Sequence, residues 1–198
     1  MKLELKQIQY NAPVTLTFTG AALVALLLGL MTGGSLTNTL FSNYRTSWFD
    51  PMQLIRLFTH VLGHVDWEHF ASNFLLILLL GPMLEEKYGS RQLTLMILFT
   101  ALVTGLIHTV CFSSSILGAS GIVFMMILLS SFGNAQSGKI PLTLLIVVAV
   151  FMGKEIVQGV FVRDNISRFA HILGGLCGGA FGYFAMEEDK KGKQVRRS

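Results

Sequence analysis

The chain has 198 residues, of which 52% are hydrophobic and only 13% are charged, and its mean hydropathy is +0.61. A soluble globular domain carries roughly 25% charged residues, so the composition excludes an ordinary soluble domain and indicates a membrane protein. The formal net charge is +4, but the basic residues lie between apolar runs and at the chain ends, as membrane topology requires. This placement argues against nucleic acid as a partner. The length fits a single transmembrane domain over residues 1–198.

Apolar runs recur along the chain, and a membrane-spanning helix needs about 20 largely apolar residues. By that measure we expect an all-α membrane protein with six transmembrane helices, at residues 14–33, 67–83, 92–111, 120–134, 140–160 and 168–186. The fourth and fifth runs have short apolar cores, which a helix surrounded by protein tolerates. The first run is too long for a signal peptide and shows no clear cleavage site, so we expect it to remain as a span.

Six spans place both chain ends on one side of the membrane, and that side holds ten of the 15 Lys and Arg residues. Basic residues accumulate on the cytoplasmic side of membrane proteins, so we expect both termini in the cytoplasm. The absence of a transit peptide favours a bacterial plasma membrane. The first connection, residues 34–66, then lies on the outer side. It is unusually long and rich in aromatic residues, and we expect it to lie in the membrane interface.

Four polar residues fall near the outer ends of different spans. His69 and Asn73 lie at the start of the second span, Ser120 opens the fourth, and His171 lies at the start of the sixth. These three spans run in the same direction, so the four side chains share one depth although they are far apart in the sequence. Ionisable groups inside a membrane are costly and usually functional. We therefore predict a shared site in the outer half of the membrane.

The local spacing fits a nucleophile and a base. His171 shares a helix face with Gly174 and Gly178, and small residues at this spacing let membrane helices approach closely. If the sixth span packs against the fourth, where Gly121 follows Ser120, the imidazole reaches the hydroxyl. That geometry activates a weak hydroxyl nucleophile.

An oxyanion site is available beside the serine. Ser120 begins a helix, where unpaired backbone N–H groups and the positive end of the helix dipole favour negative charge. The side chains of His69 and Asn73 are further donors, and such donors are worth about 10²–10³ in turnover. No Asp or Glu lies at the depth of His171, so the pattern predicts a Ser–His dyad rather than a triad.

Simpler interpretations exist for each motif. Gly118-x-Ser120-Gly121 is by itself typical of helix packing. His60 and His64, with His69, are candidates for a metal site, although they lack the HExxH spacing of a zinc protease; alternatively they hydrogen-bond the backbone and brace the loop. His108 ends the third span, and we expect it at the membrane interface.

Taken together, three motifs resemble the rhomboid family of intramembrane serine proteases. The matching segments are Gly118-Ala119-Ser120-Gly121, His69-Phe-Ala-Ser-Asn73 and Ala170-His171-Ile-Leu-Gly174-Gly175-Leu-Cys-Gly178. The resemblance covers residues 54–179 in the same order, and it implies a six-helix bundle with a water-filled cavity open to the outer side. It further implies that the fifth span is a lateral gate.

The resemblance implies a role for each site residue. Ser120 would be the nucleophile and His171 the general base, while His69, Asn73 and the Ser120 backbone N–H would form the oxyanion site. No metal or cofactor would be needed, and the substrates would be transmembrane proteins in the lipid bilayer. The alternative is a catalytically inactive rhomboid-like protein that binds transmembrane clients without cutting them.

Two positions depart from the family pattern. The family's Trp-Arg pair in the first loop is Ile55-Arg56 here, which keeps the arginine and loses the aromatic anchor. Relatives often have Tyr one turn after the serine, where this chain has Phe124, so ring stacking on the catalytic histidine is retained without a phenolic hydrogen bond. Glu85 resembles a structural glutamate of the family that follows the second span.

Overall fold

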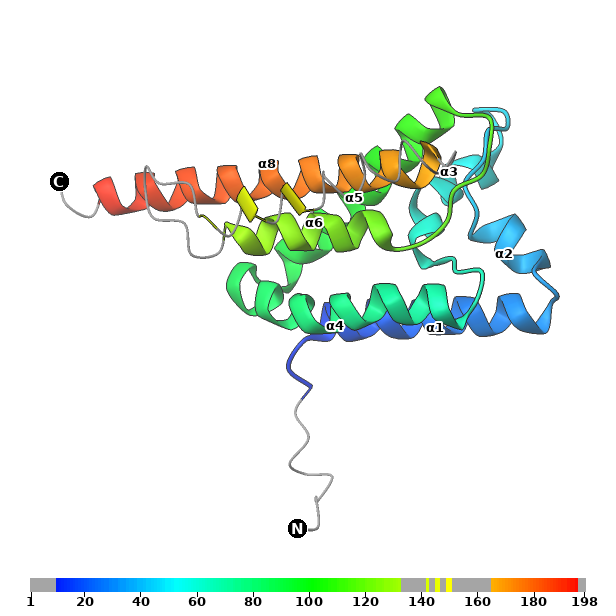
Figure 1. Ribbon diagram of the computed structural model, residues 1–198, viewed down its shortest axis with the longest axis horizontal. Helices are drawn as coiled ribbons and strands as arrows, with labels where there is room; N and C mark the ends of the chain where they lie inside the picture. Colours follow the sequence, from blue (N-terminus) through cyan, green and yellow to red (C-terminus); the bar gives the residue numbers. More distant parts are fainter. Residues whose placement is uncertain (1–9, 133–141, 143–144, 147–148, 151–164, 196–198) are drawn as a thin grey trace, which may run out of the picture.

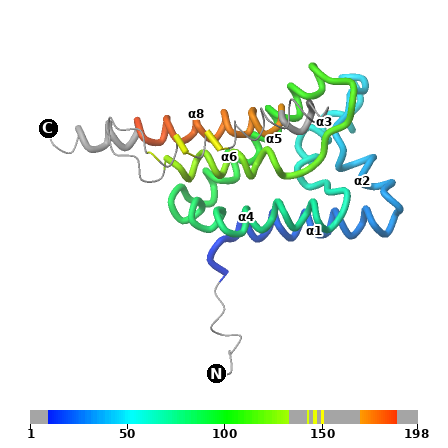
Figure 2. Tube along the Cα trace, viewed as in Figure 1, coloured from blue at the N-terminus to red at the C-terminus, as the bar shows by residue number. Residues whose placement is uncertain are grey.

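The computed structural model describes residues 10–132, 142, 145–146, 149–150 and 165–195. Within these residues all named elements are helices, connected as Figures 1 and 2 show. They are α1 (Pro13–Met31), α2 (Ser35–Leu40), α3 (Pro51–Thr59), η2 (His60–Leu62), α4 (Trp67–Tyr88), α5 (Ser90–Cys111), α6 (Ser120–Ser131) and α8 (Asn165–Val195).

Four of the six expected spans are present as helices long and apolar enough to cross a membrane: α1, α4, α5 and the Phe169–Glu187 part of α8. The fourth expected span, 120–134, is the shorter helix α6 of 12 residues, about 18 Å long at 1.5 Å per residue. The fifth, 140–160, lies for the most part outside the described residues. The protein is therefore an all-α, multi-pass membrane protein, and the count of six spans stays a prediction.

The short helix α6 forms the centre of the bundle. Most of its side chains are buried, including Met125, Met126 and Leu129. They pack with Phe74 and Ile77 of α4 in one core cluster. A helix only about 18 Å long does not cross a hydrocarbon core of about 30 Å. Because neighbouring helices enclose α6, its ends need not reach the membrane surface.

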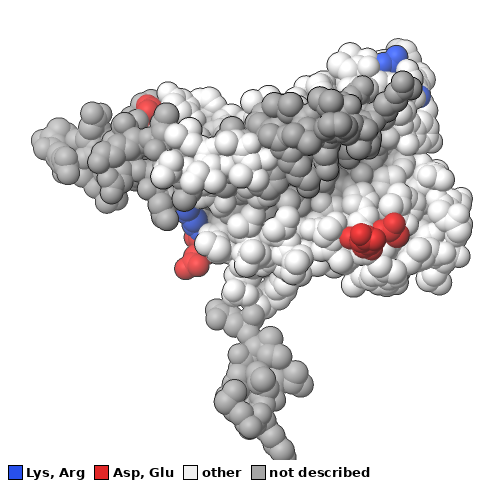
Figure 3. All heavy atoms as spheres, in the orientation of Figure 1, with Lys and Arg blue, Asp and Glu red and all other residues white. Residues whose placement is uncertain are grey.

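The directions of the helices agree with the expected topology. α4, α6 and α8 all begin at the same end of the molecule, and α1 runs antiparallel to α4 (Figure 1). α1 begins and α8 ends toward the opposite end of the molecule, on the same side of the bundle but well apart from each other (Figure 1). Among the described residues on the visible face, charged side chains form small, separate groups, with uncharged surface between them (Figure 3). Such a surface suits contact with lipid.

Glu85 ties the start of α1 to the end of α4. Its carboxylate accepts hydrogen bonds from the backbone N–H groups of Val14 (2.9 Å) and Thr15 (3.0 Å), and from the Ser90 hydroxyl (2.8 Å). The first N–H groups of a helix have no partner within the helix, and a carboxylate satisfies them while complementing the helix dipole. These contacts confirm the structural role that the resemblance implied for Glu85.

The first loop is folded around a buried arginine. The guanidinium of Arg56, 2% exposed, lies 4.2 Å from the ring centre of Tyr44 and 3.4 Å from Asp50 Oδ2. Asp50 also caps α3 by accepting from the Met52 N–H at 2.9 Å, and these contacts lower the pKa of its carboxyl. Ile55, in the place of the family's aromatic residue, is 45% exposed. The retained arginine therefore organises the loop, while the replaced position faces outward.

Candidate active site

The connection from α5 to α6 delivers the serine, and hydrogen bonds to the first loop hold it. The backbone N–H and C=O groups of Ile116 pair with those of Asn43 at 2.9 Å in each direction. Two residues on, the Gly118 N–H donates to the His60 carbonyl at 2.9 Å. The segment before Ser120 is thus fixed from outside its own helix, because its backbone partners lie in the first loop.

Gly118 is required for two independent reasons. Its φ of +119° lies in a region that residues with a side chain rarely adopt. A Cβ at this position would also lie only 2.7 Å from Nε2 of His69. The close approach shows that the imidazole of His69 packs directly against the backbone that leads into Ser120.

Ser120 is the first residue of α6, as expected from the sequence. Ala119 precedes it as the N-cap and provides no side-chain cap, so the first N–H groups of the helix have no capping oxygen from that side chain. The Ser120 side chain is half-buried. A half-buried hydroxyl at an uncapped helix start combines access for a substrate with local positive potential.

α8 packs along α6 through its glycines, as the sequence pattern predicted. A Cβ at Gly174 would overlap the backbone of Gly121, and one at Gly178 would overlap the backbone of Met125. The two helices are therefore in backbone contact one residue after Ser120. This contact carries His171, one turn before Gly174, to the start of α6.

The imidazole of His171 stacks on Phe124. The two ring centres are 4.3 Å apart and the ring planes differ by only 4°. Phe124 lies one turn after Ser120 on α6, so the stack orients the imidazole beside the helix that carries the hydroxyl. The predicted stacking at the departure from the family pattern is confirmed, and it involves no phenolic hydrogen bond.

The two remaining predicted residues lie on the first turns of α4. Asp66 caps this helix by accepting from the His69 N–H at 2.7 Å. The Asn73 side chain is 6% exposed, and its amide donates to the His69 carbonyl at 3.0 Å. Because its imidazole packs against Gly118, His69 connects the serine loop to α4.

His60 and His64 brace the first loop, which was one of the two interpretations left open. His60 Nδ1 lies 3.2 Å from the Arg56 carbonyl, and Nε2 lies 3.4 Å from the Thr104 hydroxyl. His64 Nδ1 lies 3.1 Å from the Leu62 carbonyl. Burial lowers the pKa of both histidines to about 4, so both are neutral at pH 7. Among the described residues no three His, Cys, Asp or Glu side chains are grouped to hold a metal ion.

His108, which was expected at the membrane interface, is covered by protein near the end of α5. It is 1% exposed, and its ring stacks on Phe112 with centres 5.4 Å apart. In the described part of the chain neither of its ring nitrogens has a hydrogen-bond partner. The end of α5 is covered by α3 and the first loop, and hydropathy along the sequence does not reveal such lateral cover.

The sequence analysis also missed the role of Asn43, which is fully buried. Its amide donates to the Gly105 carbonyl at 2.9 Å, and its backbone forms the bridge to the serine loop. Neither spacing nor composition distinguishes this asparagine from other loop residues. By contrast, the spacing of His60, His64 and His69 did mark these histidines in the sequence as candidate functional or structural residues.

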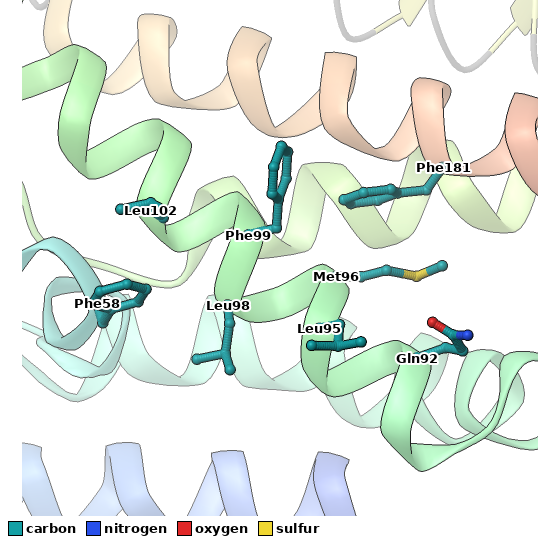
Figure 4. A pocket seen from close by; sticks show the side chains of 8 residues that line it. All are labelled: Phe58, Gln92, Leu95, Met96, Leu98, Phe99, Leu102 and Phe181. Atoms are coloured by element: carbon teal, nitrogen blue, oxygen red, sulfur yellow. The ribbon is translucent and has the colours of Figure 1, made fainter.

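A separate groove of about 400 Å³ lies along α5, between α3 and α8 (Figure 4). Its lining is almost wholly apolar: Phe58, Gln92, Leu95, Met96, Leu98, Phe99, Leu102 and Phe181. None of the predicted site residues lines it, and it offers no nucleophile or base. The groove is therefore distinct from the site at the starts of α4, α6 and α8.

Comparisons with known proteins identify the family whose sequences this chain resembles. The family model for the rhomboid domain matches residues 51–188. The chain is 31% identical over 199 residues to the rhomboid protease GluP of Bacillus subtilis (strain 168), an alignment that covers 94% of this chain and 38% of that protein. It is 25% identical over 134 residues to the chloroplastic rhomboid-like protein 11 of Arabidopsis thaliana, covering 65% of this chain and 43% of that protein. The chain thus spans about two fifths of the length of these relatives.

Proposed function

The chain belongs to the rhomboid family, and on that premise we propose that it is an intramembrane serine endopeptidase. It hydrolyses peptide bonds in or next to the transmembrane segments of other membrane proteins. The observation that carries this proposal is the glycine-mediated contact of α8 with α6, which sets the Phe124-stacked His171 beside the helix that Ser120 opens.

In the proposed reaction, Ser120 Oγ attacks the carbonyl carbon of the scissile peptide bond while His171 takes the hydroxyl proton. The tetrahedral intermediate then collapses, the C–N bond breaks, and His171 returns the proton to the leaving amine. A water molecule then attacks the resulting acyl ester while His171 takes its proton. The ester bond breaks, and His171 returns the proton to Ser120 Oγ. The half-buried state of both side chains supports a site that admits substrate and water.

The negative oxygen of the intermediate needs donors. We assign this role to the Ser120 backbone N–H, the Asn73 amide and the His69 imidazole. The packing of His69 against Gly118 supports this assignment, because it brings the imidazole to the backbone next to the nucleophile. The supporting residues are those that allow close packing or stacking around the dyad: Gly118, Gly121, Phe124, Gly174 and Gly178.

The proposed topology follows from the charge distribution. Both termini lie in the cytoplasm of a bacterial cell, and the site opens toward the outer side of the plasma membrane. Transmembrane proteins in the bilayer are the substrates, and no metal or cofactor takes part. The common direction of α4, α6 and α8 (Figure 1) supports one shared depth for the four site residues.

The alternative function is that of an inactive rhomboid-like protein that binds transmembrane clients without cutting them. The Arabidopsis relative is called a rhomboid-like protein, a name that states no activity. The presence of both Ser120 and His171 in this chain favours the protease.

Cleavage of a reporter protein with one transmembrane segment tests the proposal. We expect the wild type to cleave it and Ser120→Ala and His171→Ala to lose activity by several orders of magnitude. Ser130→Ala is the matched control, because that hydroxyl donates to the Ile127 carbonyl of its own helix at 2.8 Å, and it should cleave normally. Undiminished cleavage by Ser120→Ala would overturn the mechanism, and loss of wild-type activity with a chelator would favour a metal.

A further inference from the structure

His64 lies between Asn73, which belongs to the proposed oxyanion site, and the backbone directly before Ser120. Its hydrogen bonds determine which ring nitrogen carries the proton. The side chain is 1% exposed, and Nδ1 lies 3.1 Å from the carbonyl oxygen of Leu62. A carbonyl oxygen only accepts hydrogen bonds, so Nδ1 carries the hydrogen. Nε2 of the neutral ring is therefore an acceptor.

This single acceptor faces two donors on different elements. The Asn73 amide nitrogen lies 3.3 Å from Nε2, and the backbone N–H of Ala119 donates to the same atom at 3.5 Å. Both distances are long for hydrogen bonds, as expected when two donors share one lone pair. His64 thus links α4 to the residue directly before Ser120.

Asn73 has two amide hydrogens, and both have acceptors. One donates to the His69 carbonyl at 3.0 Å and the other faces His64 Nε2 at 3.3 Å. For Asn73 to stabilise an oxyanion, one hydrogen must change partner. The bond to His64 is the longer of the two and its acceptor is already shared, so it is the one that a negatively charged oxygen displaces.

We propose that His64 is a positioning residue for the serine chemistry. As a neutral acceptor it holds the Asn73 amide and the Ala119 N–H in place, and it yields the Asn73 hydrogen when the oxyanion forms. This inference rests on the proposed function. The rings of His69, Phe70 and Phe74 surround His64 at centre distances of 4.8, 5.5 and 5.5 Å, so a role in packing alone is the alternative to test against.

Two matched variants separate positioning from packing. In His64→Gln the side-chain oxygen takes the place of Nε2 and preserves the acceptor. In His64→Asn the side-chain amide takes the place of Nδ1, so it preserves the bond to Leu62 and removes the acceptor. Both variants lose the same ring contacts. We expect equal thermal stability but unequal rates.

The readout is labelling of Ser120 by a fluorophosphonate, alongside reporter cleavage. In labelling, the Ser120 Oγ–P bond forms, the P–F bond breaks, fluoride leaves, and His171 takes the hydroxyl proton. The phosphoryl oxygen occupies the oxyanion position. We expect His64→Asn to lower the maximal labelling rate and kcat about 10–100-fold, the range seen when outer-shell hydrogen-bond partners of metal ligands are replaced, with KM unchanged. His64→Gln should stay within about threefold of the wild type.

Equal rates in the two variants would overturn the proposal, since packing alone would then explain the residue. A double variant gives a second test: His64→Asn should add little to Asn73→Ala if it acts mainly through that amide, and multiplied losses would contradict this. Nitrogen NMR of ¹⁵N-histidine-labelled wild type needs no variant, and a His64 ring protonated at Nε2 would also overturn it. Wild type that shows no Ser120-dependent labelling would instead contradict the proposed function itself.

Discussion

Replacing Gly174 by alanine tests the contact by which α8 reaches α6. A Cβ at this position would overlap the carbonyl oxygen of Gly121 and lie 2.8 Å from its carbonyl carbon and 2.9 Å from its Cα. The obstructing atoms belong to the backbone of a buried helix, so no side-chain rotation relieves the overlap. The two helices must separate at the point where His171 approaches the start of α6.

The size of the effect follows from these distances. Non-bonded carbon atoms settle at about 3.5–4.0 Å, so the helices must move apart by about 1 Å at Gly174. Overpacking of this kind costs about 1–3 kcal/mol of stability. A displacement of 1 Å at a catalytic group can cost about 10²-fold in rate. We therefore expect kcat to fall about a hundredfold in protein that remains folded.

Gly179→Ala is the matched control on the same helix, because a Cβ at position 179 meets no atom of the described residues within 4 Å. We expect it to cleave at the wild-type rate and to gain up to about 1 kcal/mol from helix propensity. Initial rates on a transmembrane reporter and thermal unfolding in the same detergent measure both quantities. If Gly174→Ala cleaves as fast as Gly179→Ala, the close contact of α8 with α6 does not position the base.

Three further predictions concern other contacts. Phe124→Leu removes the ring that stacks on His171 at a centre distance of 4.3 Å. Such a contact is worth about 0.5–1.5 kcal/mol, so kcat should fall up to about tenfold, while Phe124→Tyr should stay near the wild type. Equal kcat values for the two variants would exclude a role for stacking. Glu85→Gln weakens the charge-assisted hydrogen bonds to the start of α1 and should lower the free energy of unfolding by about 1.5–3 kcal/mol. The rate of cleavage per folded molecule should not change. Unaltered thermal unfolding would contradict this role of Glu85. Burial lowers the pKa of His60 and His64 from 6.5 to about 4, so between these values the unfolded chain binds more protons than the folded protein. Stability should thus decline as the pH falls from 6.5 toward 4, and a flat profile in thermal unfolding would refute neutral burial.

The sequence by itself determined which helix ends carry the residues of the proposed site. Hydropathy located α1, α4, α5 and the apolar part of α8, and the order of the spans put His69, Asn73, Ser120 and His171 near the starts of helices that run in one direction. This succeeds because the hydrophobic thickness of a bilayer constrains every span along the membrane normal. The glycines at 174 and 178 also indicated which face of α8 would pack closely.

The lateral arrangement of the helices required the tertiary structure. Only there do Gly174 and Gly121 meet, only there does the first loop cover His108, and only there does His64 lie between Asn73 and Ala119. Hydropathy carries no information about neighbours at equal depth, because lipid and protein interiors are similarly apolar. Neighbours are chosen by shape complementarity and by hydrogen bonds across the bundle, and these depend on the whole set of packed helices.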